Sequence, residues 1–224
     1  MWKKARLPAF LLPITISLGI DAFAQNSSNL DFTPVTQSML NDPNPQDWLM
    51  WRGGYENWGY SPLTEINRDN VDDLRLAWSW EFAPAAPGSN GMQVEPTVYD
   101  GVMYIRHSNE KYSAHNAANG DLIWEYSRPL ASEVTGYETR LTVHRGRGVF
   151  IYEDKLISHA TDGMLFALDP RDGSLIWEVA MQDFRSGQQP SGAPVAFNGS
   201  LVVPYNCTAW TAPDPCHLSA YSTE

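Results

Sequence analysis

The chain has 224 residues, of which 43% are hydrophobic and 18% charged, a composition typical of a folded domain rather than a disordered tail. Its formal net charge of −11 argues against a partner held through its phosphate backbone, such as nucleic acid, because that partner needs a basic face. A solvated acidic surface or a basic redox partner remains compatible with this charge.

The first 24 residues have the pattern of an export signal. Three basic residues among the first six precede an apolar stretch, 7–20, and Ala22 and Ala24 supply the small residues of a cleavage site. The apolar stretch is short and contains two prolines, so it is a poor candidate for a membrane span. We expect cleavage after Ala24 and a mature protein without a membrane span in a periplasm-like compartment.

Residues 25–47 are rich in Asn, Ser, Asp and Pro and have no sustained periodicity. This composition predicts a flexible lead-in. We expect ordered structure to begin near Trp48, so that residues 48–224 belong to the folded part of the chain.

The rest of the chain contains an internal repeat. Segment 99–105 resembles segment 152–158, and segment 112–124 resembles segment 165–177, each 53 residues later. A third unit begins at residues 193–203 and continues in 218–224. Repeats of 50-odd residues are typical of propeller blades.

Short apolar strands alternate with polar turns in every unit. Asn-Gly and Asp-Gly dipeptides favour two-residue hairpin turns, because both positions tolerate positive φ. Four short strands per repeat predict an all-β protein, a partial β-propeller of about three four-stranded blades. A β-sandwich is the alternative, but it gives no reason for a constant offset. The turns are Asp100-Gly101, Asn119-Gly120, Asp162-Gly163, Asp172-Gly173 and Asn198-Gly199.

Each of the first two units closes with a tryptophan, Trp124 or Trp177. Such a ring can pack between neighbouring blades and bury a large area. The third unit reaches Glu224 before its own Gly and Trp. Since a propeller needs at least four blades to close, the sequence is expected to be a fragment of a longer propeller.

The repeat resembles the tryptophan-docking motif Ala-x-Asp-x-x-Thr-Gly-x-x-x-Trp of the eight-bladed quinoprotein dehydrogenases. Segments 48–67 and 96–104 also resemble the amino-terminal part of periplasmic alcohol dehydrogenases that depend on pyrroloquinoline quinone (PQQ). The motif is matched at Ala114, Asn116, Gly120 and Trp124, again at Ala167, Asp169, Gly173 and Trp177, and Ala220 begins a further copy.

The resemblance implies cofactor contacts at Gln93, Arg147 and Ser191, with Asn206 as a further candidate. Gln93 would bind one edge of the quinone, with Glu95 as a second choice on the same strand face. Arg147 would grip a cofactor carboxylate. The alternative readings are a solvated surface charge at Arg147 and a turn hydroxyl at Ser191.

The sequence departs from the family in two places. Leu141 and Thr142 occupy the positions at which many members form a vicinal disulfide over the quinone. Thr208 or Ala209 stands where a metal-binding Glu is expected. No metal ligand is therefore assigned to this chain.

Cys207 and Cys216 lie nine residues apart in a loop-like stretch of the exported part. A cysteine pair in an oxidising compartment favours a disulfide over two free thiols.

The resemblance implies alcohol oxidation by hydride transfer to PQQ, with Ca²⁺ or a lanthanide as Lewis acid and a cytochrome c-type electron acceptor. The family's catalytic Asp belongs to later blades, so no catalytic residue is assigned here and the 224 residues alone are expected to be inactive. The alternative function is a non-catalytic propeller that serves as a binding scaffold, which the missing metal-binding Glu favours.

Overall fold

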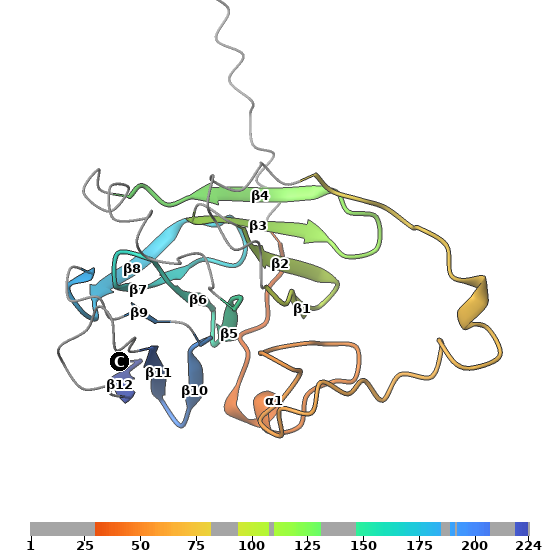
Figure 1. Cartoon of the computed structure of the whole chain (residues 1–224), viewed down its shortest axis with the longest axis horizontal. Helices are drawn as coiled ribbons and strands as arrows, with labels where there is room; N and C mark the ends of the chain where they lie inside the picture. Colours follow the sequence, from red (N-terminus) through yellow and green to blue (C-terminus); the bar gives the residue numbers. More distant parts are fainter. Residues whose placement is uncertain are drawn as a thin grey trace, which may run out of the picture.

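The computed structural model describes residues 30–81, 94–107, 110–130, 147–184, 189–190, 192–206 and 218–223. These residues form antiparallel sheets with little helix, as expected for an all-β protein (Figure 1). No helix among them is long and apolar enough to cross a membrane.

Three sheets follow one another along the chain. The first contains β1 (Thr97–Tyr99), β2 (Val102–Arg106), β3 (Lys111–Asn116) and β4 (Leu122–Ser127) in that spatial order. The second contains β5 (Phe150–Tyr152), β6 (Lys155–His159), β7 (Met164–Leu168) and β8 (Leu175–Ala180). In the third, β10 (Val195–Phe197), β11 (Ser200–Asn206) and β12 (Leu218–Ser222) pair in order, and β9 (Gln189–Pro190) pairs with β11.

The predicted repeat is confirmed by the first two sheets. Each strand of the second sheet starts 53 residues after its counterpart in the first. Even the irregularity recurs, because the register shifts between Ala114 and His115 in one sheet and between Ala167 and Leu168 in the other. The architecture is therefore a partial β-propeller with sheets as blades.

The hairpin turns agree with the prediction at two sites. Asp100 and Gly101 have φ of 47° and 73°, and Asn198 and Gly199 have φ of 47° and 75°, as both central positions of a type I′ turn require. At the other three predicted turns only the glycine has positive φ among the two residues. The β5–β6 turn was missed, since Glu153 takes φ of 53° there without an Asn-Gly or Asp-Gly signal.

Trp124 joins the first two sheets, as the motif predicted. It is 3% exposed, and its Nε1 donates to the carbonyl of Pro170 at 2.9 Å. Its ring covers Gly173, where an added Cβ would lie 2.5 Å from Trp124 Cε3. Only a glycine leaves room for the ring at this turn.

Trp78 repeats this geometry one step earlier. Its Nε1 donates to the Ala117 carbonyl at 3.1 Å, and a Cβ at Gly120 would lie 2.7 Å from its ring. Sequence reasoning missed this docking role, because Trp78 lies outside the repeat. Trp177 is only half-buried and packs against the edge of the core, so the two motif tryptophans are not equivalent.

The amino-terminal segment differs from the expected lead-in. Residues 30–47 include α1 (Gln37–Asn41), capped by the Thr36 hydroxyl, and they bury Val35 and Leu40. Val35 forms a β-bridge with Glu153, and Trp48 forms one with Val98. A helix of five residues is too short to produce a periodic sequence pattern, so no periodicity in this stretch could indicate it.

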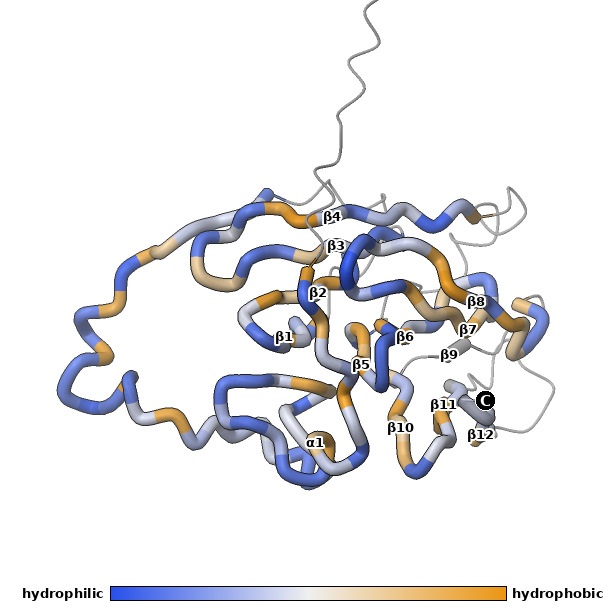
Figure 2. Tube along the Cα trace, turned by 180° about the vertical axis from the view of Figure 1, so that it is seen from behind, coloured by the Kyte–Doolittle hydropathy of each residue, from blue (hydrophilic) through white to orange (hydrophobic). Residues whose placement is uncertain are grey.

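The hydrophobic core runs through all three sheets and includes this segment. Figure 2 shows hydrophobic stretches, in orange, along strands of all three sheets. Strands β6 and β7 each bury four consecutive residues, Leu156 to His159 and Leu165 to Leu168. A strand covered on both faces is expected for a blade that lies between two others.

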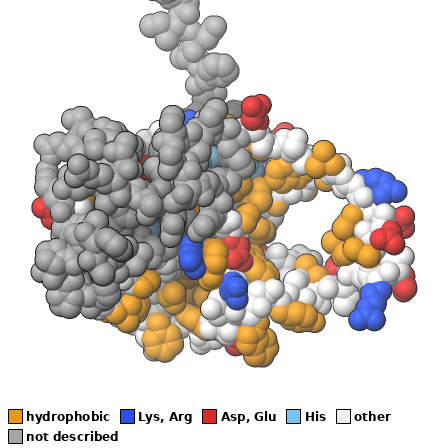
Figure 3. All heavy atoms as spheres, viewed as in Figure 1, with side chains coloured by type: hydrophobic (Ala, Val, Ile, Leu, Met, Phe, Trp, Pro, Cys, Tyr) orange, Lys and Arg blue, Asp and Glu red, His pale blue; other side chains and the backbone are white. Residues whose placement is uncertain are grey.

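Residues 58–76 leave the body as an extended arc that contains the short helix η1 (Val71–Asp73). The arc carries apolar side chains that are exposed, among them Trp58 at 77% and Leu76 at 83%. Figure 3 shows open space between this arc and the rest of the molecule.

One polar cluster on the first sheet predicts a pH effect. His107 Nε2 lies 2.5 Å from Ser113 Oγ, which lies 2.8 Å from His115 Nε2. Burial lowers the pKa of His107 from 6.5 to about 4. The folded state therefore binds fewer protons than the unfolded state between these values, so stability present above pH 6.5 is lost as the pH falls toward 4.

In this pH range, the titration of His107 should lower the free energy of unfolding by about 1.4 kcal/mol for each unit that the pH falls. Urea titrations of the 224-residue chain between neutral and acidic pH measure it, with His107→Gln as the comparison. In this variant, the dependence of the unfolding free energy on pH should be weaker by the contribution of one titrating group. Equal slopes in the two proteins would contradict the assignment.

Candidate cofactor site

The first strands of the three sheets place the candidate site. The first residue of β1 contacts the residue before β5, because Thr97 Oγ1 donates to the Val149 carbonyl at 2.7 Å. Gly148 also approaches the Glu95 carbonyl so closely that a Cβ would lie 2.8 Å from it. Backbone segments that precede β1 and β5 therefore meet at one end of the sheets.

A hollow of about 290 Å³ opens beside this point. Its walls come from the amino-terminal segment (Met50, Trp51, Tyr55), from Arg147 and from the stretch Gly192–Val195 before and at the start of β10. Arg147 is exposed, and its Cζ lies 5.6 Å from the centre of the Trp51 ring. The hollow thus combines apolar walls with one accessible cation, an arrangement suited to a planar anionic ligand.

The structure places some of the predicted contacts and leaves others outside the described residues. Arg147 lies on the hollow, as the cofactor hypothesis requires. Gln93 and Ser191 fall outside the described part of the chain, although Gly192, next to Ser191, lines the hollow. Asn206 is the last residue of β11, and only its backbone is described.

The predicted disulfide, Cys207 with Cys216, lies outside the described residues, as do the departures at positions 141, 142, 208 and 209.

Glu95, the second choice for the quinone contact, has another task. Its carboxylate accepts a hydrogen bond from Trp48 Nε1 and one from the Arg52 backbone N–H at 3.1 Å. It therefore joins the amino-terminal segment to the start of the first blade, and both bonds are made by Oε1.

Two walls of the hollow were missed by sequence reasoning. Trp51 stacks with Arg147, and Tyr55 donates to the Ala196 carbonyl at 2.5 Å while accepting from Gln37 Nε2 at 3.0 Å. Both residues belong to the stretch 48–67 that carried the family resemblance. No repeat or spacing marks them as wall residues, and only the folded path of this segment brings them there.

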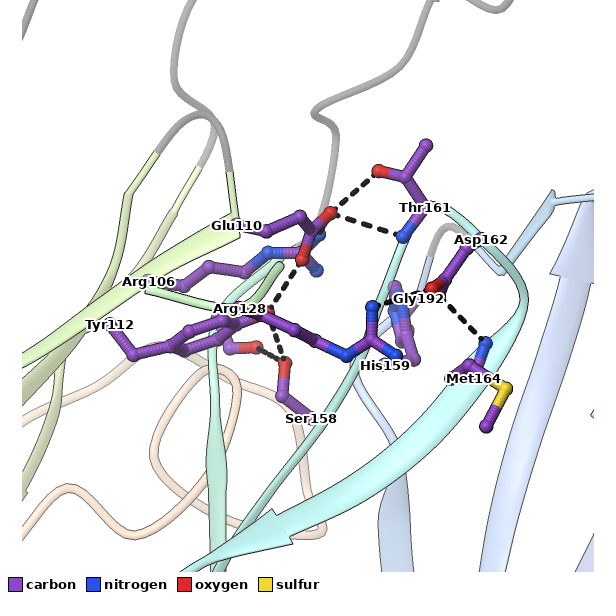
Figure 4. A network of polar contacts seen from close by, with 11 residues as sticks. Arg106, Glu110, Tyr112, Arg128, Ser158, His159, Thr161, Asp162, Met164 and Gly192 are labelled. Carbon is purple, nitrogen blue, oxygen red and sulfur yellow. Dashed lines mark hydrogen bonds and ion pairs between the residues drawn. The ribbon is translucent and has the colours of Figure 1, made fainter. Parts of the chain in front are cut away.

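A buried polar network joins the first two blades next to the hollow (Figure 4). Glu110 Oε1 accepts from Arg106 Nη2 at 2.9 Å and from Thr161 Oγ1 at 2.6 Å, and Glu110 Oε2 accepts from Tyr112 at 2.9 Å. Burial raises the pKa of Glu110, but Arg106 and these hydrogen bonds outweigh it and hold the pKa below its usual value. The carboxylate is therefore ionised and fully paired.

A second ion pair extends the network. Arg128 Nη1 contacts Asp162 at 2.5 Å and Arg128 Nη2 contacts Glu178 at 3.0 Å. Among the described residues, however, no group of three or more His, Cys, Asp or Glu side chains is arranged to hold a metal ion. The carboxylates of Glu110, Asp162 and Glu178 are paired with arginines, so we assign the network no metal.

A family model described as "PQQ: Glucose/ethanol/alcohol dehydrogenase, beta-propeller domain" matches residues 48–198. This match covers more than half of the chain. The chain belongs to the PQQ β-propeller dehydrogenase family.

Named relatives agree with this assignment. A quinoprotein alcohol dehydrogenase of Pseudomonas putida is 29% identical over 203 residues, which cover 90% of this chain and 32% of the relative. The dehydrogenase subunit of a quinone-dependent alcohol dehydrogenase of Gluconobacter oxydans is 31% identical, over 89% of this chain and 26% of that protein. The chain spans about a third or less of the length of these relatives.

Solved structures give the same fold. A quinohemoprotein alcohol dehydrogenase from Pseudomonas putida HK5 superposes with a TM-score of 0.73 at 29% identity, covering 86% of this chain and 28% of that one. A europium-containing methanol dehydrogenase gives a TM-score of 0.66 at 25% identity, covering 83% of this chain and 31% of that one.

The hollow of this PQQ-family chain fits one edge of the cofactor. PQQ is a planar quinone that carries carboxylates, and Arg147 offers an exposed guanidinium beside the flat face of Trp51. Gly192 has no side chain to obstruct the opposite wall. The described residues thus provide a cation and an aromatic surface for PQQ.

Proposed function

We propose that this chain supplies one rim of the PQQ site in a periplasmic quinoprotein that oxidises alcohols. The observation that carries the proposal is Arg147, exposed on an apolar hollow where the starts of the blades meet. The alcohol substrate is supported by the names of the relatives, which include a 1-butanol dehydrogenase of Thauera butanivorans.

Each described residue has a defined part in this proposal. Arg147 binds a PQQ carboxylate and orients the ring, and Trp51 covers one side of the hollow and excludes water. Bound PQQ supplies the quinone that accepts the hydride from the alcohol. Gln93, Ser191 and Asn206 are proposed as further polar contacts on the same rim.

Three partners complete the proposal. Ca²⁺ or a lanthanide acts as Lewis acid, which is consistent with the europium named in a related structure, but no ligand for it is placed on the described residues. Electrons pass to a cytochrome c-type acceptor, consistent with quinohemoprotein relatives. We place the catalytic base outside this chain, so the 224 residues alone should bind PQQ weakly and should not turn over.

The test measures PQQ binding by the purified 224-residue chain through the quenching of its tryptophan fluorescence. Arg147→Ala should weaken binding about tenfold or more, because a charge-assisted contact to a carboxylate is lost. Arg75→Ala is the matched control, since it removes the same charge from the exposed arc 58–76 and should leave binding unchanged.

Equal affinity in the wild type and Arg147→Ala would contradict the assignment of the rim. A dye-reduction assay with primary alcohols, PQQ and Ca²⁺ or a lanthanide tests the second part. Turnover by the 224-residue chain at a rate near that of a full-length relative would refute the placement of the catalytic base outside this chain. If a chain extended with the remaining blades bound no PQQ, the scaffold alternative would replace the enzyme.

Export is a separate proposal. Signal peptidase is expected to cleave after Ala24, so amino-terminal sequencing of periplasmic protein should begin at Gln25. A sequence that still began at Met1 would overturn it. We further propose that Cys207 and Cys216 form a disulfide in that compartment.

A further inference from the structure

The carbonyl of Gly192, on one wall of the hollow, is held by a buried histidine. His159 Nε2 lies 2.8 Å from this carbonyl oxygen. A carbonyl accepts only, so the imidazole must carry its proton on Nε2. His159 is 1% exposed and is the last residue of β6, so a rigid strand carries the donor.

Ser158, the residue before His159, contacts the residue that follows Arg147. Ser158 Oγ lies 3.4 Å from the Gly148 carbonyl, and Gly148 follows Arg147 directly. Successive side chains on a strand point to opposite faces of the sheet. The end of β6 therefore contacts the neighbour of Arg147 through Ser158 and the Gly192 wall through His159, and the His159 bond is the shorter of the two.

The surroundings keep the imidazole neutral. Burial and the nearby positive charge of Arg106 lower the pKa of His159 to about 3. Its Nδ1 and Arg106 Nη1 have no hydrogen-bond partner among the described residues. The bond to the Gly192 carbonyl thus satisfies one nitrogen of a side chain that is costly to bury, which indicates a role beyond filling space.

We propose that His159, assisted by Ser158, is a positioning residue that fixes the spacing between Arg147 and the Gly192 wall for the cofactor. This inference rests on the proposed function of the hollow. His159 acts through the Gly192 backbone, and it does not touch the cofactor.

The test compares three variants by PQQ affinity and thermal melting. His159→Phe keeps the volume but removes the donor, and it should weaken PQQ binding about tenfold. His159→Gln retains a neutral N–H donor and should stay within about threefold of the wild type. Leu156→Ala destabilises the same strand through a buried side chain remote from the hollow, so it should lower the melting temperature and leave PQQ affinity unchanged.

Hydrogen exchange supplies a readout that does not depend on PQQ. His159→Phe should accelerate amide exchange in 192–197 and leave 97–106 protected, because only the first stretch loses its tether. Unchanged exchange in 192–197 would overturn the proposal, as would PQQ affinities that follow the melting temperature across all three variants.

The experiments distinguish a failure of the proposed PQQ site from a failure of the positioning role of His159. If Arg147→Ala weakens PQQ binding and His159→Phe does not, positioning by His159 is wrong and the site stands. If the wild-type chain does not bind PQQ, the proposed function fails and the cofactor role of His159 fails with it.

Discussion

Trp124→Ala should lower the free energy of unfolding by about 3–5 kcal/mol, the range for truncating a fully buried aromatic side chain. The variant loses the packing of the ring on Gly173 and the hydrogen bond to the Pro170 carbonyl. Urea titration of the 224-residue chain measures the loss. Trp58→Ala is the control, because this ring is 77% exposed and its removal should change stability by less than about 0.5 kcal/mol.

A double-mutant cycle sharpens this prediction. Gly173→Ala should destabilise the wild type by displacing the ring, and it should cost much less once Trp124 is already Ala, since only the strain of positive φ remains. A loss below about 1 kcal/mol for Trp124→Ala, or equal costs of Gly173→Ala in both backgrounds, would contradict docking.

Glu110→Gln should cost about 3–5 kcal/mol, because it leaves the buried guanidinium of Arg106 without a counter-charge. The side chains of this pair are 4% and 0% exposed. Lys111→Ala is the neighbouring control, since its ion pair with Glu125 lies at the surface and is worth about 0–1 kcal/mol.

A double variant separates the effect of the unpaired Arg106 charge from the effect of altered packing at Glu110. Arg106→Met combined with Glu110→Gln removes the charge as well as its partner, so the double variant should recover part of the stability lost in Glu110→Gln. If the double variant is no more stable than the single one, an uncompensated charge is not the cause.

The blades were predictable because their signals are local and repeated. Gly173 and Trp177 recur at the same offset as Gly120 and Trp124, and the strand boundaries follow that offset. The family resemblance also led to Arg147, which lies on the hollow. Such patterns recur in the sequence because each blade packs against its neighbour through the same kind of contact.

The remaining features depend on contacts between distant segments. Tyr55 reaches Ala196 across 141 residues, and Thr161 reaches Glu110 across 51. Neither spacing belongs to the repeat, so no periodic pattern reports it. The docking of Trp78 was missed for the same reason, because the ring precedes the first repeat and only its target turn, 117–120, belongs to it.

The tryptophan links also set an order for assembly. Trp78 contacts the turn at residues 117–120 and Trp124 the turn at 170–173, so each link can close soon after the next turn has left the ribosome. The amino-terminal segment behaves differently, since Gln37 accepts from the Asn198 backbone N–H 161 residues away. Blades can therefore dock in sequence as they appear. The amino-terminal segment can pair with the first two blades through Trp48 and Val35, but its attachment is completed only when the third blade has formed, which marks the late step of folding.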